Sequence, residues 1–150
     1  MRLTGRECAA RLAAADHGIL CTVNASGDVD AVPVCFVVVG THLATPIERV
    51  KPKRTTELAR VRNLDRRPGA TLLCEHWDAE DWSVLWWVRA RLQRLDSREL
   101  TVPQLVDCEA ALRAKYRQYE TADFAAVIVF AVVQTMGWSA SAPPSSARRH

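Results

Sequence analysis

The sequence has no apolar stretch long enough to cross a membrane. Its longest apolar run, residues 124–133, has ten residues, whereas a spanning helix needs about 20. The first seven residues also lack the apolar core of an export signal. We therefore expect a cytoplasmic protein that does not insert into a membrane.

Several motifs that carry well-understood chemistry are absent too. There is no glycine-rich phosphate loop of the G-x-G-x-x-G or G-x-x-x-x-G-K type, no H-E-x-x-H zinc motif and no G-x-S-x-G nucleophile turn. The four histidines follow no triad order, and Glu80 and Asp81 are adjacent, so they do not face each other as an acid and a base would. If the chain is an enzyme, we expect a cofactor to supply the reactive atom.

The five cysteines form no C-x-x-C pair, and their number is odd. In a reducing compartment such cysteines are usually small buried hydrophobic residues, and we expect that structural role here. Cys74 and His76 would share one face of a strand, but two ligands do not complete a zinc site. The sequence therefore predicts no metal centre.

What the sequence does contain is a regular series of short elements. Capping patterns at Thr4–Glu7 and Thr101–Gln104 predict the starts of two helices, and short alternating apolar segments between turns predict strands. The expected order is a helix at 4–15, strands at 19–23, 29–39 and 43–47, a helix from about 56 to 67, strands at 70–77 and 82–95, a helix at 101–119 and a strand at 125–134. This order predicts a single domain over residues 1–141, mainly β, with a mostly antiparallel β-barrel and accessory helices. The Pro/Ser-rich residues 142–150 are expected to form a disordered tail.

The basic residues are concentrated in one segment. Residues 48–67 carry a net charge of +5, although the whole chain carries only +3. Lys51 and Lys53 flank a proline just ahead of an expected helix, where free N–H groups and the helix dipole favour a phosphate. A solvated helix with an arginine-rich outer face explains the same charges equally well, so composition leaves both interpretations open. A nucleic-acid interface is disfavoured, because the rest of the chain is net acidic and no recognition motif accompanies the charge.

Four of the five tryptophans, Trp77, Trp82, Trp86 and Trp87, fall within eleven residues. If residues 82–95 form one strand, Trp82 and Trp86 share one face and Trp87 lies on the other. Large aromatic residues on both faces indicate that both faces are covered, one by the core and the other by a partner subunit or a flat ligand.

The order of these motifs resembles the pyridoxamine 5′-phosphate oxidase-like superfamily. The residues that carry the resemblance are Thr45-Pro46-Ile47, Lys51-Pro52-Lys53, the run from Leu58 to Leu64 with its Arg62-Asn63-Leu64, Asp81-Trp82-Ser83, the run from Leu85 to Arg89, and Gly137-Trp138. They are similar to the actinobacterial branch of flavin/deazaflavin oxidoreductases, whose members often use coenzyme F420. The resemblance covers residues 4–138. The short C-terminus lacks the substrate-phosphate motif of true pyridoxamine phosphate oxidases, which disfavours that activity.

The resemblance implies a split β-barrel homodimer with two sites for F420 or FMN at the subunit interface. The cofactor phosphate would contact Lys51, Lys53 and Arg60, although an insertion at residues 49–56 leaves open whether only Arg60 does so. Trp82 would border the site from the other subunit. The ring system would lie against the backbone of two strands, at Val32, Pro33, Val34, Thr45, Pro46 and Ile47.

The function that the resemblance implies is hydride transfer from reduced F420, or from FMN, to an electron-poor small organic acceptor. No side chain is assigned as a catalytic acid or base. The alternative is a non-catalytic protein that binds or stores a flavin, F420 or haem. Such a protein would bind the cofactor without turnover.

Overall fold

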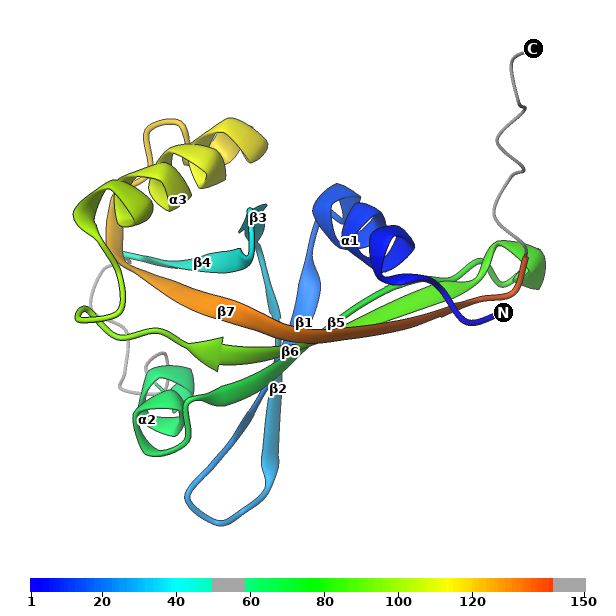
Figure 1. The fold of residues 1–150 in the computed structure, drawn as a ribbon, viewed down its shortest axis with the longest axis horizontal. Coiled ribbons are helices and arrows are strands. Elements are labelled where there is room, and N and C mark those ends of the chain that lie inside the picture. Colours follow the sequence, from blue (N-terminus) through cyan, green and yellow to red (C-terminus); the bar gives the residue numbers. More distant parts are fainter. Residues whose placement is uncertain (50–58, 142–150) are drawn as a thin grey trace.

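The computed structural model describes residues 1–49 and 59–141. Its centre is a seven-stranded sheet in which the strand order is β2-β1-β5-β6-β7-β4-β3 and all the paired strands are antiparallel. The strands are β1 (Gly18–Val23), β2 (Val29–Val34), β3 (Val37–Val39), β4 (His42–Glu48), β5 (Gly69–His76), β6 (Trp86–Arg94) and β7 (Phe124–Ser139). Figure 1 shows the long β7 crossing the whole molecule.

The two edge strands of this sheet, β2 and β3, follow one another in the chain and are separated only by Cys35 and Phe36. A flat sheet of seven strands would place its edges far apart. The short connection is possible because the sheet curls until its two edges meet. The result is a mainly β, half-closed barrel, as the sequence predicts. The strands differ from the prediction in one respect: residues 29–39 form two strands, β2 and β3, instead of one.

The break between β2 and β3 has a local cause. The Phe36 N–H donates to the Tyr116 hydroxyl at 3.0 Å, and the Phe36 carbonyl accepts from Lys115 Nζ at 2.7 Å. These side chains come from the end of α3 (Val102–Lys115). The backbone N–H and carbonyl of Phe36 are thus hydrogen-bonded to side chains at the end of α3 and not to a neighbouring strand. At this point the chain stops pairing with β1 and begins to pair with β4.

Three α-helices accompany the sheet in the described part of the chain: α1 (Gly5–Ala14), α2 (Ala59–Arg66) and α3. The capping boxes predicted at Thr4 and Thr101 are both present. The helices bury Leu12, Leu64 and Leu112. The main core also holds Leu20, Leu72, Val88, Leu92 and Phe130 from the strands, and Phe36 from the connection between β2 and β3. None of the helices among the described residues is long and apolar enough to cross a membrane.

Three predicted boundaries are wrong. Residues 82–84 form a 3-10 turn, and β6 begins only at Trp86, because the Asp81 carboxylate accepts from the backbone N–H and the hydroxyl of Ser83. The helix predicted to reach residue 119 ends at Lys115, and a 3-10 turn at Arg117–Tyr119 follows. The last strand ends at Ser139 instead of residue 134. The predicted tail at 142–150 lies outside the described residues.

Candidate functional site

A cavity of about 400 Å³ opens where the barrel fails to close, between the end of β2 and the second half of β4. Strand β3 pairs only with residues 42–44 of β4. In the described part of the chain, β4 from Thr45 onward therefore has a strand partner, β7, on one side only. The backbone of this half of β4 faces the cavity on its open side, where no other described strand pairs with it. The residues that line this β2–β4 cavity are Pro33, Val34, Cys35, Thr45, Pro46, Ile47, Glu48, Arg60 and Tyr119.

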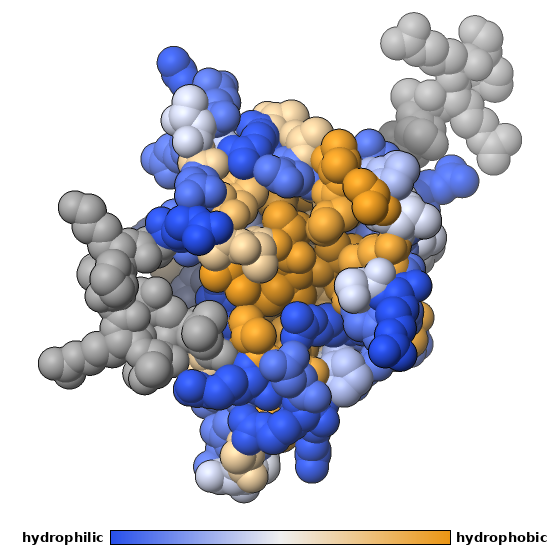
Figure 2. Space-filling view, turned by 90° about the vertical axis from the view of Figure 1, so that its left-hand side faces the viewer, coloured by the Kyte–Doolittle hydropathy of each residue, from blue (hydrophilic) through white to orange (hydrophobic). Residues whose placement is uncertain are grey.

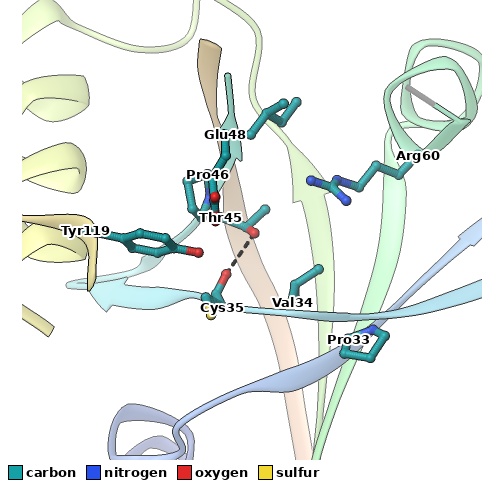
Figure 3. Close-up of a pocket in the computed structure, with 9 residues that line it drawn as sticks. Pro33, Val34, Cys35, Thr45, Pro46, Glu48, Arg60 and Tyr119 are labelled. Carbon is teal, nitrogen blue, oxygen red and sulfur yellow. Dashed lines mark hydrogen bonds between the residues drawn. The ribbon is translucent and has the colours of Figure 1, made fainter. Parts of the chain in front are cut away.

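The floor of the cavity is rigid and largely apolar. Thr45 is buried, and its hydroxyl donates to the Cys35 carbonyl at 2.8 Å, which ties β4 to the end of β2 (Figure 3). Pro33 and Pro46 have no N–H, and their rings fix the backbone on either side of the opening. Such a surface suits the face of a planar ring, with nearby backbone groups available for the polar edge of that ring.

Arg60 provides the positive charge of the cavity. It extends from the first turn of α2 into the opening between Glu48 and Val34 (Figure 3). Its Nε is buried and has no hydrogen-bond partner among the described residues. A buried guanidinium nitrogen without a partner is costly. This cost would be offset by an anionic ligand, since arginine binds phosphate and carboxylate oxygens through charge-assisted hydrogen bonds.

Asn63 holds α2, and therefore Arg60, against the strands. Its amide nitrogen donates to Thr22 Oγ1 at 3.0 Å and to Asp30 Oδ2 at 2.8 Å, and its Oδ1 accepts from Arg66 at 3.1 Å. Asn24 donates to the other Asp30 oxygen at 3.1 Å. These two amide hydrogen bonds, from Asn63 and then Asn24, lower the pKa of Asp30, so the carboxylate stays ionised.

The side of the cavity opposite Arg60 is formed by Tyr119, which the sequence analysis did not single out. Its side chain is only 9% exposed, and its hydroxyl points into the cavity (Figure 3). Arg113 holds this turn by donating to the Tyr119 carbonyl at 2.7 Å. Burial, together with the neighbouring Cys35 and Glu48 groups, raises the pKa of the Tyr119 hydroxyl. The phenol therefore stays protonated and can donate a hydrogen bond to a bound ligand.

The structure brings together six of the ten residues predicted for cofactor binding: Pro33, Val34, Thr45, Pro46, Ile47 and Arg60. Val32 instead lines a neighbouring cavity, described below. Lys51 and Lys53 lie outside the described residues. Cys35, Glu48 and Tyr119 were missed. Glu48 follows directly on the predicted ring-binding strand, but nothing in the pattern near Tyr119 indicates a cavity wall.

Trp82 lies on the far side of the molecule from this cavity. It is 66% exposed and sits in the 3-10 turn between β5 and β6, where its ring lies 5.8 Å from that of Trp77. The outer face of β1, β5 and β6 nearby forms an apolar groove of about 540 Å³ that includes Leu73, Trp87 and Arg89. If Trp82 contributes to the cavity, it must do so from another chain.

The cysteines are free, and their placement is mixed. Cys8, Cys74 and Cys108 are buried, as expected for structural cysteines, whereas Cys21 and Cys35 are half-buried. His76 is exposed at the end of β5, while Cys74 faces the core. Among the described residues there is no group of three His, Cys, Asp or Glu side chains that could hold a metal ion.

A second cavity, of about 520 Å³, follows directly along β2. This β2–α2 cavity is lined by Thr22, Val29, Asp30, Ala31, Val32, Ala59 and Arg60. Residues 29–32 of β2 border this cavity and residues 33–34 border the β2–β4 cavity. Arg60 lines both cavities, so its side chain marks the boundary between them.

Solved structures share this fold at low sequence identity. A FAD-binding protein from Mesorhizobium loti has a TM-score of 0.64 at 14% identity, over 91% of this chain and 95% of its own. A proposed pyridoxamine 5′-phosphate oxidase from Corynebacterium glutamicum has a TM-score of 0.62 at 11% identity, over 93% and 98%. The haem storage protein from Vibrio cholerae has a TM-score of 0.59 at 14% identity, over 88% and 89%.

These similarities confirm the expected fold, the split β-barrel of the pyridoxamine 5′-phosphate oxidase-like proteins. No protein-family model and no curated protein matches the sequence. The same fold is found in flavin-binding and haem-storing proteins, and fold alone does not decide between such functions.

Proposed function

We propose that the chain is an oxidoreductase that binds a flavin or deazaflavin, FMN, FAD or coenzyme F420, with the ring system in the β2–β4 cavity. The observation that carries this proposal is the buried Nε of Arg60, which has no hydrogen-bond partner among the described residues, beside a floor of apolar side chains at the open side of β4. A planar ring attached to a phosphate has the two properties that this cavity would complement. The cofactor, when bound, would supply hydride transfer to an electron-poor organic acceptor.

The residues of the chain would bind and orient the cofactor. Arg60 would neutralise a phosphate oxygen, and Pro33 and Pro46 would support one face of the ring. The Thr45 hydroxyl donates a hydrogen bond to the Cys35 carbonyl and would keep the floor of the cavity in place. Tyr119, which stays protonated, would donate a hydrogen bond from the opposite side. No side chain is assigned as the proton donor.

The test is a flavin titration of two variants from the same helix. Arg60→Ala removes the proposed phosphate contact, whereas Arg62→Ala removes an exposed arginine two positions away. A charge-assisted hydrogen bond contributes about 1.5–3 kcal/mol, so we expect Arg60→Ala to weaken binding roughly 10- to 150-fold. Arg62→Ala should change the flavin affinity by less than about threefold. Equal, small effects of both variants would contradict the assignment of Arg60 to the phosphate site.

A non-catalytic binder is the second candidate. Cys35 lines the cavity, and a cysteine thiolate can ligate haem iron. Haem titration followed by the Soret band measures this directly. If haem binds more tightly than any flavin, and if Cys35→Ala shifts the band, storage or sensing of haem becomes the better interpretation.

We also propose that the chain acts as a homodimer. The support is the apolar groove on the outer face of β1, β5 and β6, together with the exposed Trp77 and Trp82 beside it. Apolar surface of this extent is costly to leave in water and is typical of an interface.

A further inference from the structure

We propose that the β2–α2 cavity binds the adenosine half of a dinucleotide flavin, so that FAD is the preferred cofactor. This inference rests on the proposed function, because it assumes that a flavin ring occupies the β2–β4 cavity. It is carried by the position of the second cavity, its apolar surface and its one acidic group.

The position of Arg60 is the first argument. The two cavities follow one another along β2, and Arg60 lines both of them. Its buried, unpartnered Nε therefore lies where a ligand that filled both cavities would pass from one to the other. In FAD the group between the two ring systems is a diphosphate. A ligand that ended at a single phosphate would leave the second cavity, of about 520 Å³, unused.

The second argument is the exposed apolar surface of the β2–α2 cavity. Val32 is 37% exposed, and Ala59 lines the same cavity from α2. Surface aliphatic side chains that line a cavity are commonly covered by a ligand. A purine ring is flat and partly apolar, and it would remove Val32 from water.

Asp30 provides the polar group in the same cavity. Its Oδ2 accepts from Asn63 and its Oδ1 accepts from Asn24, which fixes the orientation of the carboxylate. A carboxylate has about four acceptor positions, so two remain for the hydroxyl groups of a ribose. The same negative charge disfavours an acidic tail, because a second carboxylate beside Asp30 would be repelled. The cavity thus favours FAD over the acidic tail of F420.

The experiment compares FAD, FMN and coenzyme F420 binding to the wild-type chain and to two variants. Val32→Glu places a charge in the β2–α2 cavity without touching the β2–β4 cavity. Val102→Glu is the control, since Val102 is an exposed valine, at 76%, in the first turn of α3 and lines neither cavity. We expect FAD to bind the wild type at least tenfold more tightly than FMN. Val32→Glu should weaken FAD about tenfold or more and FMN less than about twofold, whereas Val102→Glu should change neither.

Each other outcome decides a different question. Equal affinity for FAD and FMN, with no effect of Val32→Glu, would overturn the adenosine site but leave the flavin site standing. Tight binding of F420 with weak binding of FAD would do the same. If none of the three cofactors binds, the proposed function itself fails. Ala59→Glu, on the α2 side of the same cavity, replaces Val32→Glu if circular dichroism shows that the latter is misfolded.

Discussion

Asn63 is the residue on which the position of α2 depends. It is only 2% exposed, and its carboxamide makes hydrogen bonds to Thr22, Asp30 and Arg66. We expect Asn63→Leu, which has a similar volume, to lower the free energy of unfolding by about 1–3 kcal/mol, because it leaves buried partners unpaired. Urea unfolding measures this loss. Arg62→Leu on the exposed side of the same helix should change the midpoint little, and an unchanged midpoint for Asn63→Leu would contradict the role given to Asn63.

The Cys74 thiol makes the free energy of unfolding fall at alkaline pH. Burial raises its pKa from 9.0 to about 11. In the unfolded chain this thiol ionises near its ordinary pKa, so between about pH 9 and 11 the folded state holds the proton more tightly. Its contribution to stability is therefore complete below pH 9 and is lost as the pH rises to 11, by roughly 2–3 kcal/mol. Cys74→Ala should show a correspondingly shallower fall of unfolding free energy over this range. Equal slopes in both proteins would show that another group, such as Tyr116, dominates.

At the residue scale, the sequence predicts the parts of the site that belong to regular strands. The family resemblance implies Pro33, Val34 and Thr45 to Ile47 as ring contacts and Arg60 as a phosphate contact, and all of them line one cavity. Tyr119 could not be predicted in this way. It enters the cavity from a turn after α3, and its contact with Cys35 joins residues 84 positions apart. Such contacts depend on how the sheet curls, which no local pattern contains.

At the element scale, Gly137 sets how closely α1 packs on the end of β7. A Cβ at this position would lie 2.9 Å from the Trp87 carbonyl, 3.0 Å from Cys8 Sγ and 3.0 Å from Leu3. We expect Gly137→Ala to destabilise the fold by about 1–3 kcal/mol, the usual cost of overpacking a core. Gly69→Ala is the control, because a Cβ there meets nothing within 4 Å. Thermal unfolding of the two variants distinguishes them, and equal melting temperatures would show that α1 moves aside without cost.

The elements also show where local patterns stop predicting structure. The helix starts at Thr4 and Thr101 were predictable because a capping box involves residues only three apart. The break after Val34 was not predictable, because Tyr116 and Lys115, about 80 residues away, take the backbone groups of Phe36. The late start of β6, at Trp86 instead of residue 82, has a local cause, the Asp81 cap on Ser83, but a run of apolar residues conceals it.

At the scale of the whole molecule, one chain presents apolar surface on more than one side. Figure 2 shows an apolar area in the middle of one face, surrounded by hydrophilic residues. The first turns of α3 expose Val102, Leu105 and Val106. The outer groove beside Trp77 and Trp82 is separate from it. Of the two surfaces, the outer groove is the better candidate for the dimer interface, because the large exposed side chains of Trp77 and Trp82 lie beside it.

This choice makes a prediction about assembly and cofactor binding together. Leu73→Glu places a charge in the outer groove, whereas Val102→Glu places one on α3, at a position that is 76% exposed. If the groove is the interface, a buried charge without a partner costs several kcal/mol, so sedimentation should show Leu73→Glu as a monomer and Val102→Glu as a dimer. If Trp82 borders the β2–β4 cavity of the other chain, the Leu73→Glu monomer should also bind flavin at least tenfold more weakly. If the Leu73→Glu monomer binds flavin as tightly as the wild type does, the site is complete within one chain. If Leu73→Glu remains a dimer, the interface lies elsewhere, and α3 is the next surface to test.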